Sequence, residues 1–514
     1  MAKLCLCLTA KTIDRNLEIL NKYRKFTDLA ELRVDCLDPD ERLYIRRFPE
    51  LAGMPVILTV RRDNDGGRYS GGEGARVKLL ALGLSYAKAD YRQNFAYVDI
   101  EDDLDVPNLE EAARTFGTRI IRSFHDLSGV NDNLGAKMES MHRAGDEIVK
   151  VSVTVKSTAD VLSVYKASKA CAGMDKILIC MGHYGIYSRI LAEKFGSFLS
   201  YSSALSENEV SGAPGQLDVK ELAEMYRFRK ISKKTKIFGI VGNPLKSSVS
   251  PWFFNTIFGL ENTDAVYVPF PSDSISYFLE LAKELDVQGL SITVPYKEAI
   301  LPYLTKCSNA VHSIGACNTV YSYADGEWFG ENTDVTGFSD SLLTFLDRKN
   351  LKRQKITIIG AGGAARAAAS EVHRYGGKAL ILNRTIHKAR NIASQYGFRW
   401  GGLDSNGIEM MVKHSDIIIQ TTSVGMEGYD VSDPLELYTF TGKEAVIDLI
   451  YAPPQTPFLK RAAAAGCRTI NGYDMVIRQA CMQYSYFIGK EIPQQLLSRV
   501  NAGENAKWSK IRTG

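Results

Sequence analysis

Short apolar runs rich in β-branched residues alternate with amphipathic stretches along the first half of the chain. The runs begin at Lys3, Leu29, Pro55, Phe95, Thr118, Glu147, Lys176 and Ser197. Helical patterns follow Ile13, Ala75, Thr158 and Leu217. Eight strand–helix units within about 225 residues are typical of a (β/α)8 barrel, in which helices enclose a ring of parallel strands. A doubly wound open sheet is the alternative, but the even spacing favours closure.

A second α/β pattern follows a short basic segment, residues 227–236, which we interpret as a linker. Strands are expected from Lys236, Ala265 and Asp286. After Lys352 the pattern reads strand, glycine turn, small-residue helix and second strand, as in nucleotide-binding βαβ units. The predicted fold class is α/β throughout: an N-terminal (β/α)8 barrel, then a two-domain unit with a Rossmann domain in its C-terminal half.

The composition restricts the class of protein. Of the 514 residues, 45% are hydrophobic and 24% are charged, and the net charge of +4 is spread along the chain. This gives no support to nucleic-acid binding, and no apolar run is long enough to span a bilayer. The nine cysteines contain no C-x-x-C pair, which fits free thiols in a reducing compartment. We expect small-molecule substrates, no metal, and a cytoplasmic location, or a plastid one if a transit peptide has been removed.

Charged residues stand near the ends of the expected barrel strands, where barrel enzymes place their reactive groups. Lys150 lies within an apolar strand; inside the barrel, desolvation and cationic neighbours would lower its pKa and give an amine that attacks carbonyls. His125 would then suit proton transfer. The alternatives are a lysine that points outward or pairs with a carboxylate, and a structural histidine. Three arginines on one rim, Arg33, Arg61 and Arg189, favour a carboxylate clamp over separate ion pairs.

This first half resembles type I 3-dehydroquinate dehydratases. The shared motifs are ELRVD, TVR-x-x-x-D-GG, SFHD, IVKVSV, MG-x-x-G-x-x-SR and APGQ. The resemblance implies that Lys150 forms an imine with the substrate C3 carbonyl. It implies that His125 removes a C2 proton and then protonates the departing C1 hydroxyl. Arg189 would hold the substrate carboxylate, and further substrate contacts would come from Glu31, Arg33, Arg61 and Gln216.

Two positions depart from the pattern of that family. Asp65 stands where the family usually has glutamate, and we expect its carboxylate to hydrogen-bond His125 and hold the ring. The two glycines that follow would let the loop bring this shorter side chain closer. A simple turn residue is the alternative, because Asp-Gly is common in turns. Gly212 stands where the family usually has serine, with Ser211 one position earlier.

The second half carries a glycine-rich turn between a strand and a helix, beginning at Gly360. In this context the turn indicates pyrophosphate binding at a helix N-terminus. The next strand ends at Asn383 and Arg384, where NAD-binding chains carry an acidic residue. An arginine there suits the 2′-phosphate of NADP, which we favour as the cofactor. An exposed loop arginine that binds no ligand is the alternative. Lys297 and Asp334 are separately more typical of surface charges. As a pair they would donate a proton to the alkoxide oxygen during carbonyl reduction.

These residues resemble shikimate dehydrogenases over about 270 positions. The shared motifs are GNPLKSSVSP, TVPYK, GACNTV, GENTD, GAGGAARA, NRT, TTSVGM, DLIYAPPQTPFL and GYDMVIRQA. The resemblance makes Lys297 and Asp334 the catalytic pair, and Ser291 stands where many members have asparagine. It implies substrate contacts from Ser248, Ser250, Thr293, Asn318, Asp334, Tyr451 and Gln479. It implies cofactor contacts from Gly360, Ala361, Gly362, Gly363, Ala364, Asn383, Arg384, Thr385, Lys388, Leu449 and Gly472.

Together the two resemblances imply consecutive reactions: dehydration of 3-dehydroquinate, then NADPH-dependent reduction of 3-dehydroshikimate to shikimate. The predicted domains are the barrel at 1–228, a substrate domain at 237–350 with a returning helix at 476–505, and an NADP domain at 351–475. Three alternatives stay open: one inactive half, a quinate dehydrogenase in the second half, and a non-catalytic metabolite-binding or scaffold protein.

Overall fold

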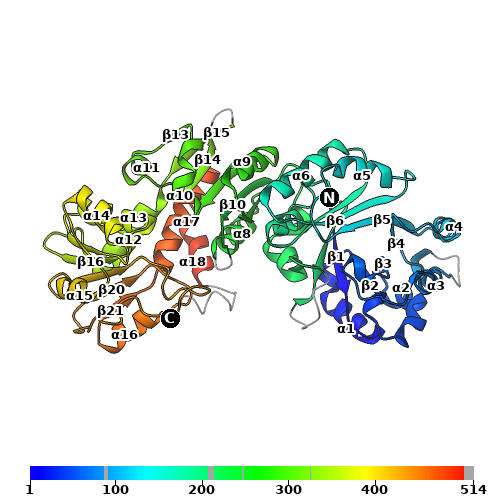
Figure 1. The fold of residues 1–514 in the computed structure, drawn as a ribbon, viewed down its shortest axis with the longest axis horizontal. Coiled ribbons are helices and arrows are strands. Elements are labelled where there is room, and N and C mark those ends of the chain that lie inside the picture. Colours follow the sequence, from blue (N-terminus) through cyan, green and yellow to red (C-terminus); the bar gives the residue numbers. More distant parts are fainter. Residues whose placement is uncertain (86–90, 206–212, 246–247, 324–325, 503–514) are drawn as a thin grey trace. The chain divides into compact units, whose positions relative to one another are not determined.

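The structure, a computed structural model, describes residues 1–85, 91–205, 213–245, 248–323 and 326–502. The chain divides into two compact units (Figure 1). The first comprises Met1–Gly239 with Glu261–Val287, and the second comprises Ile240–Leu260 with Gln288–Gly514.

Eight parallel strands of the first unit lie where the sequence predicts them. They are β1 (Lys3–Leu8), β2 (Leu29–Arg33), β3 (Val56–Thr59), β4 (Tyr97–Glu101), β5 (Arg119–Asp126), β6 (Ile148–Thr154), β7 (Lys176–Met181) and β8 (Leu199–Ser203). Each strand from β1 to β6 pairs with the next, and β8 returns to β1. A bridge between Lys176 and Ser197 joins β7 to the segment that enters β8. The ring confirms the predicted barrel over the open sheet.

Helices surround these strands (Figure 1). They are α1 (Ile13–Tyr23), α2 (Phe48–Ala52), α3 (Glu73–Gly83), α4 (Pro107–Thr115), α5 (Leu134–Met141), α6 (Thr158–Ala170) and α7 (Ile186–Ile190). Side-chain caps mark where two of them begin: Thr12 caps α1, and Ser157 caps α6 in a reciprocal box with Asp160. The helix predicted after Leu217 starts later and is shorter than its pattern indicates. Strand β9 (Leu217–Asp218) pairs with β8 there, and a short helical segment, Glu221–Met225, follows.

The barrel interior is built in layers, because side chains two residues apart on a strand point the same way. The apolar cluster in the barrel includes a layer with one residue from each strand: Cys5, Leu29, Ile57, Tyr97, Ile121, Ile148, Ile177 and Leu199. Two residues further along come Cys7, Glu31, Thr59, Asp99, Ser123, Lys150, Ile179 and Tyr201, all buried. We call this second set the polar layer. The strand alternation that builds the core therefore also turns charged groups inward at the carboxyl end of the barrel.

Two further sheets follow along the chain. The first has the order β11–β10–β12–β14–β15–β13, with β14 antiparallel to β12 and β15. Its strands are β10 (Lys236–Gly242), β11 (Ala265–Pro271), β12 (Val287–Ile292), β13 (Lys306–Cys307), β14 (Thr319–Tyr323) and β15 (Glu327–Glu331). Its helices are α8 (Ser250–Leu260), α9 (Ile275–Glu284), α10 (Tyr296–Ala299), α11 (Asn309–Ile314) and α12 (Thr333–Leu346).

The last sheet is parallel, with the order β18–β17–β16–β19–β20–β21. Its strands are β16 (Lys355–Ile359), β17 (Lys378–Leu382), β18 (Arg399–Gly401), β19 (Ile417–Gln420), β20 (Ala445–Asp448) and β21 (Arg468–Ile470). Its helices are α13 (Gly363–Arg374), α14 (Ile386–Tyr396), α15 (Ser405–Val412) and α16 (Pro457–Ala464). In chain order this is the 3-2-1-4-5-6 arrangement of dinucleotide-binding sheets, which confirms the predicted Rossmann fold.

The C-terminal part of the described chain forms two helices, α17 (Tyr473–Ile488) and α18 (Gln494–Ala502). They are separate because Gly489, at φ 81°, ends α17 in a left-handed conformation. Helix α17 packs closely on α12: a Cβ at Gly337 would lie only 3.0 Å from the Gln479 Cβ. This close approach brings residues of both helices into one cavity.

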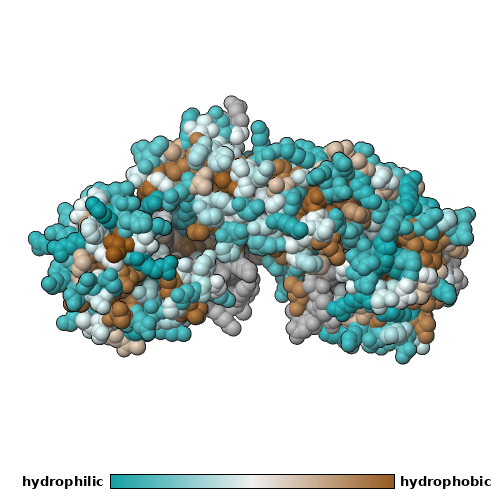
Figure 2. Space-filling view, in the orientation of Figure 1, coloured by the Kyte–Doolittle hydropathy of each residue, from teal (hydrophilic) through white to brown (hydrophobic). Residues whose placement is uncertain are grey.

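The molecular face in Figure 2 is mainly hydrophilic, with apolar residues in scattered patches. Within the part of the chain that the structure describes, none of the helices combines the length and apolar character that crossing a membrane requires.

Candidate active sites

A cavity of about 80 Å³ opens among the polar residues of the barrel. Every dehydratase residue predicted from the sequence lines it: Glu31, Arg33, Arg61, Asp65, His125, Lys150, Arg189 and Gln216. The sequence analysis missed Cys7, Ser152, Ile179, Met181 and Tyr201, which line it as well. The sequence could have revealed them by strand alternation. Each stands two or four positions after a residue of the apolar layer, so its side chain points into the barrel.

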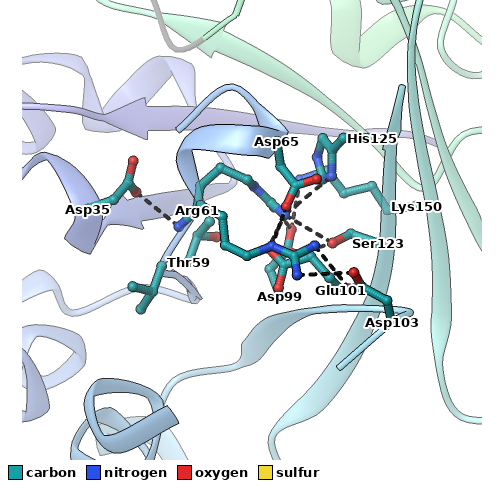
Figure 3. A network of polar contacts seen from close by, with 12 residues as sticks. Asp35, Thr59, Arg61, Asp65, Asp99, Glu101, Asp103, Ser123, His125 and Lys150 are labelled. Atoms are coloured by element: carbon teal, nitrogen blue, oxygen red, sulfur yellow. Dashed lines mark hydrogen bonds and ion pairs between the residues drawn. The ribbon is translucent and has the colours of Figure 1, made fainter. Parts of the chain in front are cut away.

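Lys150 lies inside the barrel and is only 4% exposed. Its Nζ is 2.7 Å from Asp99 Oδ2, which also lies 2.7 Å from Arg61 Nη2. Ser123 donates to the other oxygen of Asp99 at 2.5 Å (Figure 3). Burial alone would raise the pKa of Asp99, but the Arg61 and Lys150 cations outweigh it and hold that pKa well below its usual range. The lysine is thus both inward-facing and paired with a carboxylate, and Asp99 is the anion at the centre of the site.

His125 lies at the end of β5, with its Nδ1 3.3 Å from Arg61 Nη1 (Figure 3). Burial lowers the pKa of this histidine well below 6.5, and the nearby Arg61 and Lys150 cations lower it further. The ring is therefore neutral near pH 7 and able to accept a proton.

Asp65 lines the same cavity as His125, but the hydrogen bond predicted between them is not formed among the described residues. Instead, Asp65 Oδ2 accepts from Arg62 Nε at 2.6 Å. The reason is local: Arg62 stands three residues earlier on the same turn and reaches the short aspartate side chain. The catalytic role of Asp65 stays a prediction. The Gly212 departure and Ser211 lie outside the described residues.

The three arginines of the predicted clamp differ in their partners. Arg33 forms a 2.8 Å ion pair with Asp35, and Arg61 is 2.6 Å from Glu101 as well as close to Asp99. Arg189 Nε and Nη1, in contrast, are buried and have no hydrogen-bond partner among the described residues. Burial lowers the pKa of this guanidinium to about 10. A buried guanidinium with two unused donors is suited to bind a carboxylate. Of the three arginines in the predicted clamp, Arg189 is therefore the one best placed to bind it.

A second cavity, of about 250 Å³, lies within the second unit. The predicted substrate residues Ser248, Ser250, Thr293, Lys297, Asn318, Asp334, Tyr451 and Gln479 all line it. Two predicted cofactor residues, Ala364 and Leu449, border it too. Burial raises the pKa of Tyr451 to about 12, so its hydroxyl keeps its proton at neutral pH. The sequence analysis missed Gln483, whose Oε1 accepts from Ser291 Oγ at 2.7 Å.

Lys297 and Asp334 form the predicted pair, with Nζ 2.5 Å from Oδ2. Asn318 Nδ2 donates to the other Asp334 oxygen at 2.8 Å. Asp334 stands in the first turn of α12, where the helix dipole favours a carboxylate. The carboxylate is thus held on three sides and fixes the position of the lysine ammonium in the cavity.

The glycine turn after β16 fits a dinucleotide. Gly360 has φ +113°, and a Cβ there would lie 2.5 Å from Thr421 Oγ1. Helix α13 begins at Gly363 without a side-chain cap, which leaves its first N–H groups available for an anion. A Cβ at Gly363 would lie 3.9 Å from Lys297 Cδ, so this helix end lies near the catalytic pair. Arg384, after β17, is exposed and without a side-chain partner among the described residues, which suits a 2′-phosphate.

The remaining predicted cofactor residues lie around this turn. Ala361 and Gly362 complete it, and Asn383 Nδ2 donates to the Thr385 carbonyl at 3.0 Å. Lys388 is exposed on α14. Gly472 stands directly before α17, where a Cβ would lie 2.1 Å from the Leu449 carbonyl oxygen, so a glycine is needed there.

Comparisons with known proteins cover both halves. Family models match at residues 4–233 (type I 3-dehydroquinase), 240–320 (shikimate dehydrogenase substrate binding domain) and 344–427 (shikimate / quinate 5-dehydrogenase). The chain is 30% identical to the chloroplastic bifunctional 3-dehydroquinate dehydratase/shikimate dehydrogenase of Arabidopsis thaliana, over 96% of this chain and 83% of that protein. It is 34% identical to the shikimate dehydrogenase (NADP(+)) of Streptococcus mutans, over 52% of this chain and 95% of that protein. A solved shikimate dehydrogenase from Aquifex aeolicus is 31% identical with a TM-score of 0.48, covering 52% of this chain and 98% of its own.

Proposed function

The chain belongs to the bifunctional 3-dehydroquinate dehydratase/shikimate dehydrogenase family, and we propose that the barrel cavity carries the dehydration and the second cavity the reduction. The protein converts 3-dehydroquinate to 3-dehydroshikimate and reduces this product to shikimate with NADPH. It is an enzyme of the shikimate pathway, so a purely non-catalytic role is excluded. The observation that carries the barrel assignment is the enclosure of Lys150 with a neutral histidine and with Arg189, whose Nε and Nη1 have no hydrogen-bond partner among the described residues.

In the barrel, the Lys150 amine adds to the C3 carbonyl carbon, and the carbonyl oxygen leaves as water to give the imine. His125 takes the C2 proton, and the electrons move into the C2–C3 bond and neutralise the imine nitrogen. The C1–oxygen bond then breaks as His125 returns the proton to the departing hydroxyl. Hydrolysis of the imine releases 3-dehydroshikimate and restores the amine. Arg189 holds the carboxylate throughout, and Glu31, Arg33, Arg61 and Gln216 contribute the other substrate contacts.

In the second cavity, bound NADPH supplies a hydride to the substrate carbonyl carbon. Lys297 donates the proton to the developing alkoxide, and Asp334 holds the ammonium in place. Ser248, Ser250, Thr293, Asn318, Tyr451 and Gln479 bind the substrate. On the cofactor side, the turn at Gly360 and the N-terminus of α13 would hold the pyrophosphate, and Arg384 would pair with the 2′-phosphate.

The domain boundaries that we propose are 1–228 for the dehydratase, 237–350 with 476–505 for substrate binding, and 351–475 for NADP. We also propose a reducing location, the cytoplasm or a plastid. All nine cysteines are free thiols, which supports it.

Trapping with borohydride tests the imine directly. Reduction in the presence of 3-dehydroquinate is expected to fix the ligand on Lys150, as a mass increase of the peptide that contains this residue. Lys150→Arg keeps the positive charge and is expected to show no label. A label on any other lysine, or none in the wild-type enzyme, would remove the proposed mechanism. An oxidation assay with quinate and NADP+ separately tests whether the second half accepts that substrate.

A further inference from the structure

Tyr201, on β8, is a member of the polar layer that none of the roles above uses. We infer that Tyr201 is a further substrate-contact residue of the dehydratase, whose hydroxyl donates a hydrogen bond to a hydroxyl group of 3-dehydroquinate. The inference rests on the proposed imine chemistry, because it places the substrate against Lys150.

The position of Tyr201 points to this contact. Its side chain lines the barrel cavity together with Lys150, Arg189 and Gln216. The Lys150 Nζ lies 4.7 Å from the centroid of the tyrosine ring, within cation–π range. A substrate bound covalently to this nitrogen is therefore held next to the tyrosine.

The hydroxyl of Tyr201 is buried and has no hydrogen-bond partner among the described residues. The residue is only 4% exposed, so its hydroxyl is shielded from bulk solvent. A buried hydroxyl without a partner destabilises a fold, and where one persists beside a cavity a ligand is the natural partner. Arg189, on the same cavity, has two buried donors without a partner in the described part of the chain, while its Nη2 donates to the Pro214 carbonyl at 3.1 Å.

The hydroxyl acts as a donor. Burial raises its pKa well above the usual value for tyrosine, and the nearby Glu31 and Asp99 carboxylates raise it further. The O–H therefore stays protonated in the working range of the enzyme. Arg189 takes the substrate carboxylate, which leaves the hydroxyl oxygens of the substrate ring as acceptors for the tyrosine.

The chain offers a matched control in Tyr187, on α7. Its hydroxyl is also buried and without a partner among the described residues, but it does not line the cavity. Tyr201→Phe and Tyr187→Phe thus remove the same group from equally buried positions. Both are expected to raise the melting temperature without ligand, since each removes an unsatisfied hydroxyl.

The test compares the two variants in the full-length enzyme. Tyr201→Phe is expected to raise the KM for 3-dehydroquinate about two- to tenfold, the loss of one neutral hydrogen bond, with kcat retained. Tyr187→Phe is expected to leave KM unchanged. An unchanged KM in Tyr201→Phe, with Lys150 still labelled by borohydride in the wild-type enzyme, would overturn this inference alone. Failure to label Lys150 in the wild-type enzyme would instead overturn the proposed function. A fall in melting temperature for Tyr201→Phe alone would show that its hydroxyl has a protein partner, and would also count against the contact.

Discussion

The buried carboxylate of Asp99 is surrounded by positively charged side chains of the dehydratase cavity. Lys150 and Arg61 both lie 2.7 Å from the same oxygen, and His125 contacts Arg61. Three titratable or cationic groups therefore act on one another at close range, in surroundings that screen them poorly. The chemical consequence is a neutral histidine beside a lysine whose amine faces the cavity.

The pH profile of dehydration tests this view of His125. Its pKa is lowered well below 6.5, so the neutral form persists where an ordinary histidine is half protonated. Dehydration needs the neutral form to take the C2 proton, so kcat/KM is expected to hold as the pH falls to 6.5. It declines only as the pH passes down through the lowered pKa. An acidic limb with its midpoint above pH 7 would contradict the assignment.

Lys297 offers a second prediction at the scale of one residue. Lys297→Ala is expected to slow the reduction of 3-dehydroshikimate about 10²–10⁴-fold, because a general acid is lost. NADPH affinity, measured by fluorescence titration, is expected to hold because the side chain pairs with Asp334 rather than with the glycine turn. Dehydration by the same chain serves as the control for correct folding of the barrel. Collapse of NADPH binding would make the residue structural instead.

Among the elements, the turn from β16 into α13 is the most sterically demanding part of the nucleotide site. Gly360→Ala would place a methyl group 2.5 Å from Thr421 Oγ1 at a φ of +113°. We expect it to destabilise the second unit by about 1–3 kcal/mol and to weaken NADPH binding. Gly362→Ala is the control for stability, because nothing lies within 4 Å of a Cβ there and its φ is −94°. Calorimetry measures both; equal melting temperatures would refute the steric argument.

Most elements could be predicted because short apolar runs alternate with amphipathic stretches along the sequence. The eight barrel strands are apolar runs flanked by turns, and the Rossmann strands follow the same rule. The segment after Leu217 was predicted only in part: its pattern indicates the helical segment Glu221–Met225 but not the pairing of its first residues with β8. A local pattern does not reveal such a non-local partner.

The residues of the candidate sites also divide into those that the sequence predicts and those that it does not. Motif residues such as Lys150 and Lys297 could be predicted because they stand out chemically against apolar neighbours. Their partners could not: Lys150 meets Asp99 across 51 positions in the sequence. The closure of the barrel and the register of its strands bring these two side chains together. The contact of Asp65 with Arg62 rather than His125 likewise depends on one turn's geometry.

At the scale of the whole molecule, each cavity lies entirely within one compact unit. Mutations in one cavity are therefore expected to act independently of the other, since none of the described residues lines both. Lys150→Ala is predicted to abolish dehydration while the reduction of 3-dehydroshikimate stays within about twofold of wild type. Separate assays with the two substrates check this; equal loss of both activities in a folded variant would contradict the division.

The most direct measurement gives the purified protein 3-dehydroquinate and NADPH together and identifies every product. Two consecutive active sites predict one NADPH oxidised for each 3-dehydroquinate consumed, with shikimate as the product. Lys150→Ala in the same mixture is predicted to oxidise no NADPH until 3-dehydroshikimate is added. Accumulation of 3-dehydroshikimate without NADPH oxidation, or formation of quinate in place of shikimate, would contradict the account.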